Sequence, residues 1–338
     1  MIELTPLSNA PRLLLKAELE PLQTDRFQPT GFPDLGPATY TLADDTEMLL
    51  VESAQSIANR AEAACWDEAK SDLVPALHGL PYVKVDVTDG KDVLGTTASL
   101  LEAHRLNSPY VLQGTSDGGR TFQETFLDAA GFKPGAPIER GKFLAALLRF
   151  DPGCLLHGLF MSNVEDGRMR LARALSGFIE ARGVRVAQSG GVKNDRVNAS
   201  GKTEEGFGNV PFARTEFTAA SITAFFGMDL VQIRGYGLPA AATEMLMLLS
   251  LYKVRKLLRD GLRLRTACDL HAKDLSVSAP EGFSCPSLAD LEAALPAAIR
   301  ACASSFAKPP RTDLRFQVTA ASARASKKVR KAAEERTS

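Results

Sequence analysis

The chain has 338 residues, of which 45% are hydrophobic and 24% are charged, an ordinary composition for a globular protein of one or two domains. Its first residues contain no basic segment followed by an apolar core, and its longest apolar run, from Met245 to Tyr252, is too short to span a bilayer. We therefore expect a cytoplasmic protein without a membrane partner.

The residue pattern also argues against a metal centre and against most enzyme classes. The five cysteines include no Cys-x-x-Cys pair, and the four histidines stand at unrelated spacings. The chain lacks a Walker loop, a glycine-rich dinucleotide motif and a recognisable Ser/His/Asp or Cys/His signature. We expect no metal, no cofactor and no catalytic residue, and a binder of phosphate backbone rather than an enzyme.

The formal net charge of zero conceals a division along the chain. Residues 1–140 contain 11 basic and 21 acidic residues, whereas residues 141–338 contain 29 basic and 19 acidic ones. This asymmetry predicts one basic working face, and it would suit copies that stack head to tail. The alternative is uneven solvent-exposed charge that serves no partner.

The first predicted strand, Pro11–Leu19, leads into a loop of unusual composition. The loop, residues 25–36, holds two aromatic residues, two prolines and two glycines beside several polar side chains. Loops of this kind often carry function, because a scaffold holds them while they stay exposed. Arg26 and Gln28 suit a phosphate or a base edge, and Phe27 suits stacking on a base. The alternative is an ordered surface loop held by its own phenylalanines.

Residues 41–140 form an acidic, partly helical segment that we interpret as an insertion on a sheet. Its predicted elements are a helix from Glu47 to about Ala64, a strand Tyr82–Val87, a helix Thr97–Leu106 and a helix Gln123–Ala130. The second helix ends in a polar group that includes His104, Arg105 and Asn107. A single histidine in such a place is more often structural than catalytic.

After a short predicted helix, Lys142–Arg149, the centre of the chain predicts two strands. The run Cys154–Met161 is almost continuously apolar, which favours a central strand with His157 in the core. The second strand, Arg170–Ile179, carries arginines on both faces. Because buried unpaired charge is costly, we expect one of these faces to be wet or bound to a ligand.

Residues from about 182 to 212 predict a long hairpin arm. The segment is rich in Gly, Asn, Lys and Glu and has too few apolar residues for a core. Gly190 and Gly191 would allow close backbone approach, while Lys193, Arg196 and Lys202 supply charge. The run Val210–Phe226 then returns as a strand, and a short helix is the alternative for part of it.

The stretch Gln232–Pro239 predicts a tight turn before a long helix from Ala240 to about Asp260, which Gly261 ends. Glycines beside a helix N-terminus allow a phosphate to approach its free amides and positive dipole end. The alternative is a turn without a ligand.

The last third of the chain predicts three further elements: an alternating half-buried strand Leu262–Leu270, a closing helix Leu288–Phe306 broken near Pro296, and a basic disordered tail at residues 319–338. The tail would suit electrostatic contact with nucleic acid.

Six of the segments described above resemble the signature blocks of one family, and they occur in the family's order between about residues 12 and 309. The family is the RAMP backbone subunit of the type I-G (formerly I-U) CRISPR surveillance (Cascade) complex. The blocks are Asp25–Gly36, Leu50–Ser56, Leu100–Ser108, Ser189–Asp195, Gln232–Gly237 and Leu262–Leu270.

The resemblance implies an α+β fold with an RRM-like (ferredoxin-like) palm, in which two helices lie behind a four-stranded antiparallel sheet. A helical finger insertion and a hairpin thumb would complete a single RAMP domain at residues 1–318. The implied boundaries are a palm at about 10–40, 141–181 and 213–310, fingers at about 41–140, and a thumb at about 182–212.

The resemblance also implies a function and partners. Copies of such a subunit stack along a CRISPR RNA and present its spacer for pairing with target DNA, so that base pairing reads the sequence while the protein holds the backbone. Other type I-G subunits and a recruited helicase–nuclease would be further partners. Type I backbone subunits are generally not nucleases, whereas type III relatives cut RNA with a placed aspartate, which leaves Asp34 and Asp195 open.

Thirteen residues in the matching segments are candidates for RNA binding. Phe27 and Tyr236 would stack on bases, and the amides of four glycines would donate to phosphates, while polar side chains would contact phosphate or sugar. The glycines are Gly190, Gly191, Gly235 and Gly237, and the polar residues are Arg26, Gln28, Arg105, Asn107, Lys193, Asn194 and Arg234.

Two other classes of function remain open. The first is a RAMP endoribonuclease that processes precursor CRISPR RNA with His104 or His157 as general acid and base. The second is a small-molecule enzyme of the α/β type, which predicts a deep apolar pocket and no bound RNA.

Overall fold

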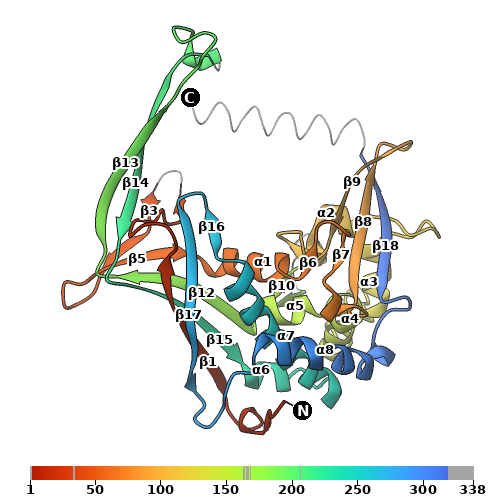
Figure 1. The fold of residues 1–338 in the computed structure, drawn as a ribbon. Coiled ribbons are helices and arrows are strands. Elements are labelled where there is room, and N and C mark those ends of the chain that lie inside the picture. The colour runs from red at the N-terminus through yellow and green to blue at the C-terminus, as the bar shows by residue number, and fades with distance from the viewer. Residues whose placement is uncertain are drawn as a thin grey trace.

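The computed structural model describes residues 2–32, 35–162, 164, 167, 169–205 and 207–318, so Asp34 and the predicted tail lie outside the described residues. The main sheet has seven strands in the order β16-β17-β1-β15-β12-β5-β4, and each neighbouring pair is antiparallel. In that order the strands are Arg263–Arg265, Cys268–Ala279, Arg12–Pro21, Ser221–Asp229, Leu175–Arg182, Glu47–Glu52 and Thr39–Thr41. Figure 1 shows this sheet curling beneath the projecting arm.

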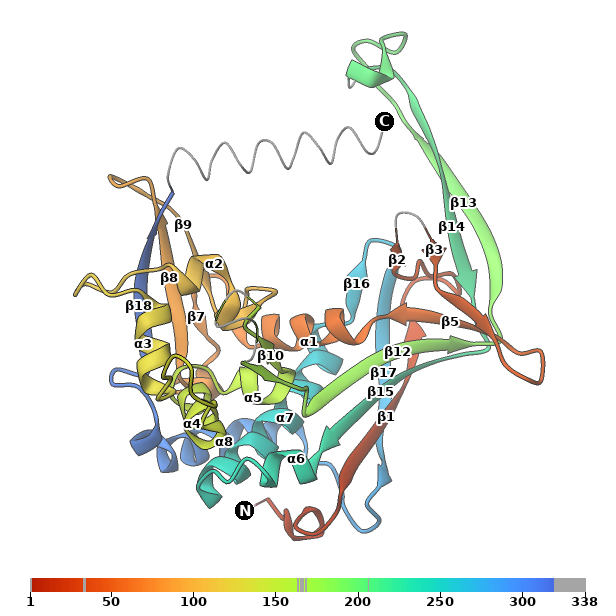
Figure 2. The same ribbon diagram turned by 180° about the vertical axis from the view of Figure 1, so that it is seen from behind.

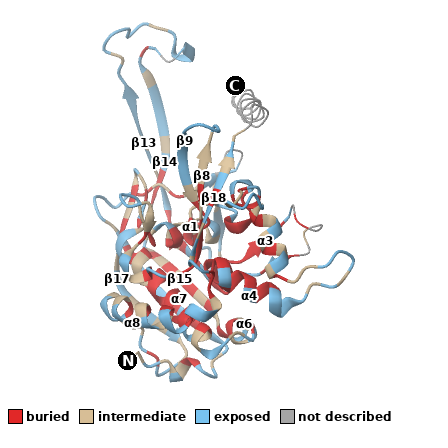
Figure 3. Cartoon of the chain, turned by 90° about the vertical axis from the view of Figure 1, so that its right-hand side faces the viewer, coloured by how far each residue is buried: buried red, intermediate tan, exposed pale blue. Residues whose placement is uncertain are grey.

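One face of the main sheet is buried and the other faces solvent. Along β1 every second residue, from Leu13 to Leu19, is buried, while the residues between them are exposed. Helices α1, Ala54–Ala63, and α7, Ala240–Asp260, cover the buried face and contact each other. Figure 3 shows the buried residues gathered between these helices and the sheet. The alternation of β1 is the pattern that an antiparallel sheet with one wet face requires.

The acidic segment builds a second, smaller sheet with strand order β18-β8-β9. Strand β8, Tyr82–Thr88, pairs antiparallel with β9, Val93–Ala98, and parallel with β18, Arg311–Gln317. Helices α2, Pro109–Leu112, α3, Phe122–Ala129, and α4, Arg140–Phe150, pack beside it. Strands and helices distant in sequence therefore meet here, because β18 comes from the end of the described chain.

The arm is a two-stranded hairpin of β13, Arg185–Lys193, and β14, Val210–Thr218. It projects on the same side of the molecule as the β8–β9 hairpin, and the two stand apart across an open space (Figures 1 and 2). The turn at its tip is organised by Asp195, whose carboxylate accepts hydrogen bonds from the amides of Val197, Asn198 and Gly208 at 2.8–3.0 Å. Asp195 therefore has a local structural task.

Several sequence predictions of element type are wrong. The predicted helix from Glu47 to Ala64 is strand β5 followed by α1, which Ser53 caps by accepting a hydrogen bond from the amide of Ser56. Strands β4 and β5 therefore belong to the main sheet. The predicted helix Thr97–Leu106 is also absent, because β9 continues to Ala98 and a turn follows.

The apolar run Cys154–Met161 is not a central strand. It forms helix α5, Gly153–His157, and then the short strand β10, Leu159–Phe160, which pairs with β11, Arg170–Leu171. A short apolar run cannot by its periodicity distinguish a buried helix from a buried strand. His157 is 3% exposed, which confirms its predicted place in the core.

The C-terminal elements mix confirmed and wrong predictions. Helix α7 has the predicted ends, with Pro239 as its N-cap and Gly261 as its C-cap. The predicted strand Leu262–Leu270 is instead the tight hairpin of β16 and the start of β17. Helix α8, Leu288–Ala301, continues through Pro296 rather than breaking there.

The parallel β18–β8 pairing predicts that the end of the described chain protects the second sheet. Chains that end at residue 310 and at residue 318 should differ in amide exchange of β8, because removal of β18 turns β8 into an edge strand. Exchange should accelerate by at least about tenfold, which corresponds to about 1.4 kcal/mol of opening free energy. Hydrogen exchange mass spectrometry measures this, with α7 as the internal control. Equal protection of β8 in both chains would contradict the pairing.

Candidate nucleic-acid interface

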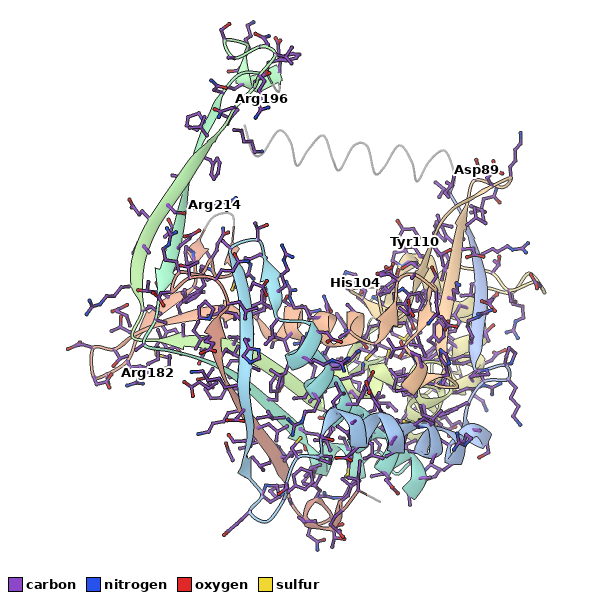
Figure 4. All side chains as sticks on the ribbon, viewed as in Figure 1. Asp89, His104, Tyr110, Arg182, Arg196 and Arg214 are labelled. Carbon is purple, nitrogen blue, oxygen red and sulfur yellow. The ribbon has the colours of Figure 1, made fainter. Side chains whose placement is uncertain are left out.

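A cleft of about 930 Å³ lies between helix α1, the turn at residues 103–109 and the β10–β11 pair. Helix α1 contributes Gln55 and Asn59, which lie one turn apart, while Ile57 and Ala61 on its other side are buried. In Figure 4, His104 from the turn lies on the side from which the arm and the β8–β9 hairpin both project. The helical spacing of α1 puts Gln55 and Asn59 on the side that lines the cleft, and the turn at residues 103–109 supplies further lining residues.

The rim of the cleft carries two arginines. Arg170 lies on β11 and is exposed, whereas Arg173 is partly buried. The guanidinium of Arg173 donates from Nε to the carbonyl oxygen of His157 at 3.2 Å and contacts the side-chain oxygen of Gln55. Burial, followed by the charge of Arg105, lowers the pKa of Arg173. Arginine side chains at such a rim can bind phosphate groups.

The floor of the cleft rests on a buried charged cluster. Glu62 of α1, which is 1% exposed, lies 2.9 Å from Nε of Arg105 and 3.3 Å from Nζ of Lys253 on α7. Lys253 Nζ also lies 3.1 Å from Nε2 of His157. Burial, followed by the positive charge of Lys253, lowers the pKa of His157, so its ring is neutral. The cluster joins α1, α5, α7 and the 103–109 turn.

Asp151 belongs to the same buried region. Burial, followed by the negative charge of Glu62, raises the pKa of Asp151 to about 6. Its Oδ1 accepts a hydrogen bond from the amide of Gly153 at 2.8 Å. A β-carbon at Gly153 would lie 2.6 Å from Glu62 Oε1 and 2.8 Å from Asp151 Oδ1, so only glycine fits beside this pair.

The arm forms the second part of the candidate interface. Lys193, Asn194 and Arg196 are exposed near its tip, and Gly190 and Gly191 lie exposed in β13. The guanidinium of Arg214 lies 4.9 Å from the centre of the Phe212 ring, and this ring is 37% exposed. The arm therefore presents cationic, amide and aromatic groups of the kinds that contact single-stranded nucleic acid.

The loop at residues 25–36 attaches to the base of the arm. Phe27 and Phe217 exchange two backbone hydrogen bonds of 2.9 Å. Arg26 is exposed, and its guanidinium lies 3.6 Å from Glu216 on β14. The side chain of Gln28 is half-buried. Arg26 and Gln28 are therefore held beside the arm, but Arg26 already has an acidic partner.

Two predicted base stackers are not available in this structure. The ring of Phe27 is 0% exposed, so it packs in the core rather than against a base. Tyr236 is 4% exposed, and its hydroxyl donates to the carbonyl oxygen of Leu155 at 2.7 Å. Both aromatic rings serve the core, where large apolar side chains contribute most.

The turn before α7 also has a structural task. Arg234 donates to the carbonyl oxygens of Leu7 and Ala10, at 3.0 and 2.8 Å. The amides of Gly235 and Gly237 donate to the carbonyl oxygens of Val231 and Arg234. This corrects their prediction as phosphate donors, because each amide already has a partner. The turn also lies at the opposite end of the molecule from the arm (Figure 1).

The structure thus divides the predicted residues into three groups. The cleft floor contains Arg105 and Asn107, both buried, and the arm carries Gly190, Gly191, Lys193 and Asn194, with Arg26 and Gln28 at its base. The turn before α7 stands apart from both. Of the residues that line the cleft, the sequence offered Asn59 as one that could face a ligand, with a solvated face as the alternative. It did not assign Gln55, Phe160, Arg170 or Arg173 to a site, although Gln55 lies in the matching block Leu50–Ser56 and the two arginines stood on opposite faces of a predicted strand.

The fold is a mixed α+β arrangement around a curled antiparallel sheet, and its site combines a polar cleft with a projecting hairpin. A family model described as CRISPR-associated protein GSU0053 matches residues 13–186, just over half of the chain. The chain belongs to this family. No curated protein matches the sequence.

Two solved structures show a more distant similarity. One is titled "CRISPR RNA-guided surveillance complex, pre-nicking", with 14% sequence identity, a TM-score of 0.43, and coverage of 83% of this chain and 82% of that chain. The other is Csc2 of Thermofilum pendens, with 10% identity, a TM-score of 0.28, and coverage of 83% of this chain and 70% of that chain.

Two further findings concern only the part of the chain that the structure describes. No helix there is long and apolar enough to cross a membrane. The same residues contain no group of three or more His, Cys, Asp or Glu side chains that could hold a metal ion.

Glu62→Gln should strongly destabilise the protein, because Arg105 and Lys253 would lose their shared carboxylate while remaining buried. Breaking a buried ion pair in this way costs about 3–5 kcal/mol. Urea denaturation measures the change in the free energy of unfolding. Glu68→Gln is the control, because Glu68 is exposed and lies just beyond helix α1, and it should change the free energy of unfolding by less than about 0.5 kcal/mol. An equally small effect of Glu62→Gln would contradict the role of the cluster.

The pKa of Asp151 predicts how stability depends on pH. Its pKa is raised from 3.8 to about 6 in the folded protein, so the folded state binds this proton more tightly. The free energy of unfolding of the native protein, relative to Asp151→Asn, should therefore rise by about 1 kcal/mol between pH 8 and pH 5. Denaturation of both proteins at the two pH values measures this difference. A constant or falling difference would be the contrary result.

Proposed function

We propose that the protein is a non-catalytic backbone subunit that binds CRISPR RNA in a type I-G surveillance complex. The observation that carries this proposal is that a member of a CRISPR-associated family places an arm with exposed basic residues and an arginine-rimmed cleft on one side of the molecule. Copies would stack head to tail along the spacer and present it for pairing with target DNA. Other subunits and a recruited helicase–nuclease would join the assembled complex.

The order of the strands supports an RRM-like palm. Four strands of the main sheet occur along the chain in the order β1, β12, β15, β17, with other elements between them. In the sheet they lie in the order β17-β1-β15-β12. Helix α1 is among the elements between β1 and β12, and α7 lies between β15 and β17. This βαββαβ sequence is that of ferredoxin-like folds. In this interpretation the arm is the thumb and the second sheet belongs to the fingers.

The chemistry of the arm supports binding that does not depend on base sequence. Its exposed groups include cations, side-chain and backbone amides and a partly exposed aromatic ring, which can contact any nucleotide. A guide RNA has a variable spacer, so a subunit that covers it must hold the backbone and leave the reading of sequence to base pairing. The carboxylate of Asp195 already accepts three backbone hydrogen bonds at the arm tip. It holds the turn rather than serving RNA cleavage, and this supports a binding role for the arm.

One observation favours a second candidate function. His104 is exposed and lines the cleft together with Arg170, so a general acid or base and a phosphate-binding group would face the same RNA. This arrangement would suit an endoribonuclease that processes precursor CRISPR RNA. Cleavage of repeat RNA without added metal, abolished by His104→Ala, would favour this second function over the first.

Lys193→Ala should weaken RNA binding by a similar factor for all spacer sequences, because Lys193 would contact phosphate. The slope of log affinity against log salt should become shallower by about 0.7, the single-strand value per phosphate contact. Fluorescence anisotropy over a range of salt concentrations measures both effects. Arg300→Ala, which removes an exposed charge from α8, is the control and should change neither. A loss that depends on the spacer sequence would contradict the proposal.

Co-expression with a CRISPR array tests the assembly itself. The purified protein should carry a discrete RNA protected from ribonuclease and should elute as a large assembly. A monomer free of nucleic acid, with and without the array and with the partner subunits present, would overturn the proposed function.

A further inference from the structure

We infer that the floor of the cleft binds ribose 2′-hydroxyl groups and thereby selects RNA over DNA, an inference that rests on the proposed RNA-binding function. Three side chains that line the cleft are buried: Arg105 is 4% exposed, Asn107 is 6% exposed and His157 is 3% exposed. Within the described part of the chain, Arg105 Nη2, Asn107 Oδ1 and His157 Nδ1 have no hydrogen-bond partner.

Such unpaired groups are costly in a folded protein. A buried donor or acceptor without a partner loses its contact with water and gains no hydrogen bond in exchange. The backbone of Arg105 adds strain, because its φ of 50° lies in the left-handed region that non-glycine residues rarely adopt. Three unpaired polar atoms and one strained residue around a single cleft indicate that a ligand supplies the missing partners.

Whether each of these atoms donates or accepts a hydrogen bond follows from its neighbours. Lys253 offers only hydrogen-bond donors, so the neutral ring of His157 accepts through Nε2 and carries its proton on Nδ1. Nδ1 of His157 and Nη2 of Arg105 are therefore both donors. Asn107 uses its amide nitrogen to donate to Ser162 Oγ at 3.3 Å, which leaves Oδ1 as an acceptor. The buried floor thus contains two donors and one acceptor.

The charge of the floor favours a neutral ligand group. Glu62 and Asp151 are carboxylates beside the cations Arg105 and Lys253, so the two signs are balanced in the buried cluster when Asp151 is ionised. A phosphate would find a more favourable place at the rim, near Arg170 and Arg173. A hydroxyl both donates and accepts, and it matches the mixed polarity of the floor without added charge.

The ribose 2′-hydroxyl is the neutral group that every RNA nucleotide carries and every DNA nucleotide lacks. A base edge would differ from one spacer to the next, whereas the proposed subunit must accept any spacer. With phosphates at the arginine rim and sugars toward the floor, the cleft would hold RNA without reading its sequence. The same cleft would bind DNA less tightly than RNA, because only RNA would supply partners for the buried donors and acceptor.

The test measures the affinity of the full chain for three labelled oligonucleotides of one sequence: RNA, DNA, and RNA with 2′-O-methyl groups. The native protein should bind RNA more tightly than the other two. Asn107→Ala leaves the Glu62 ion pairs in place and should reduce RNA affinity by about 3- to 10-fold, the factor of one net hydrogen bond of about 0.5–1.5 kcal/mol. Its DNA affinity should stay unchanged. Arg170→Ala is the matched control and should weaken RNA and DNA by the same factor.

Each contrary outcome is distinct. Equal affinity of the native protein for RNA and DNA would overturn the inference even if Asn107→Ala did not fold, and it would leave the proposed RNA binding standing. A variant Asn107→Ala that is folded and loses RNA and DNA affinity equally would also overturn it. Absence of binding to any of the three oligonucleotides would remove the proposed function and this inference together.

Discussion

The buried carboxylate of Glu62 is the constraint on which the site depends. It lies between the guanidinium of Arg105 and the ammonium of Lys253, and each of these groups comes from a different part of the chain. A buried ion is tolerated only when charged partners and hydrogen bonds compensate for the lost water. Helix α1, the 103–109 turn and helix α7 must therefore meet at one place. The cleft lies beside this meeting point, since Arg105 and His157 belong to the buried cluster and also line the cleft.

The two parts of the candidate interface use different physical means. The arm carries its cations in water, where each interaction with phosphate is weak, salt-dependent and independent of sequence. The cleft holds polar atoms away from water, where an unpaired donor or acceptor is costly and a matching ligand group is correspondingly favoured. Together they would combine non-specific attraction with chemical selection. The arm and the β8–β9 hairpin project on the same side of the molecule (Figure 1).

Local patterns predicted those elements whose residues all favour one structure. Helix α7 consists of good helix formers between Pro239 and Gly261, and the apolar run of β1 has the length of a strand, so both elements were predictable, although the alternating burial of β1 was not. Prediction failed for Glu47–Ala64, where residues with helical spacing pair with β12 as a strand before α1 begins. It failed again for Cys154–Met161, because full burial removes the polar side that would reveal the period. Of the candidate site, the arm was predictable from its composition, and the cleft was not.

The sequence by itself determined the arm, the long helix, the division of charge and the resemblance to CRISPR-associated proteins, because each is carried by neighbouring residues or by the order of segments along the chain. Only the tertiary structure decided which polar residues share a site. It placed Arg105 and Asn107 in the cleft with Arg170 and Arg173, and it placed Phe27 and Tyr236 in the core. The reason is that burial and pairing depend on contacts between distant segments, and a single residue type does not specify its partner.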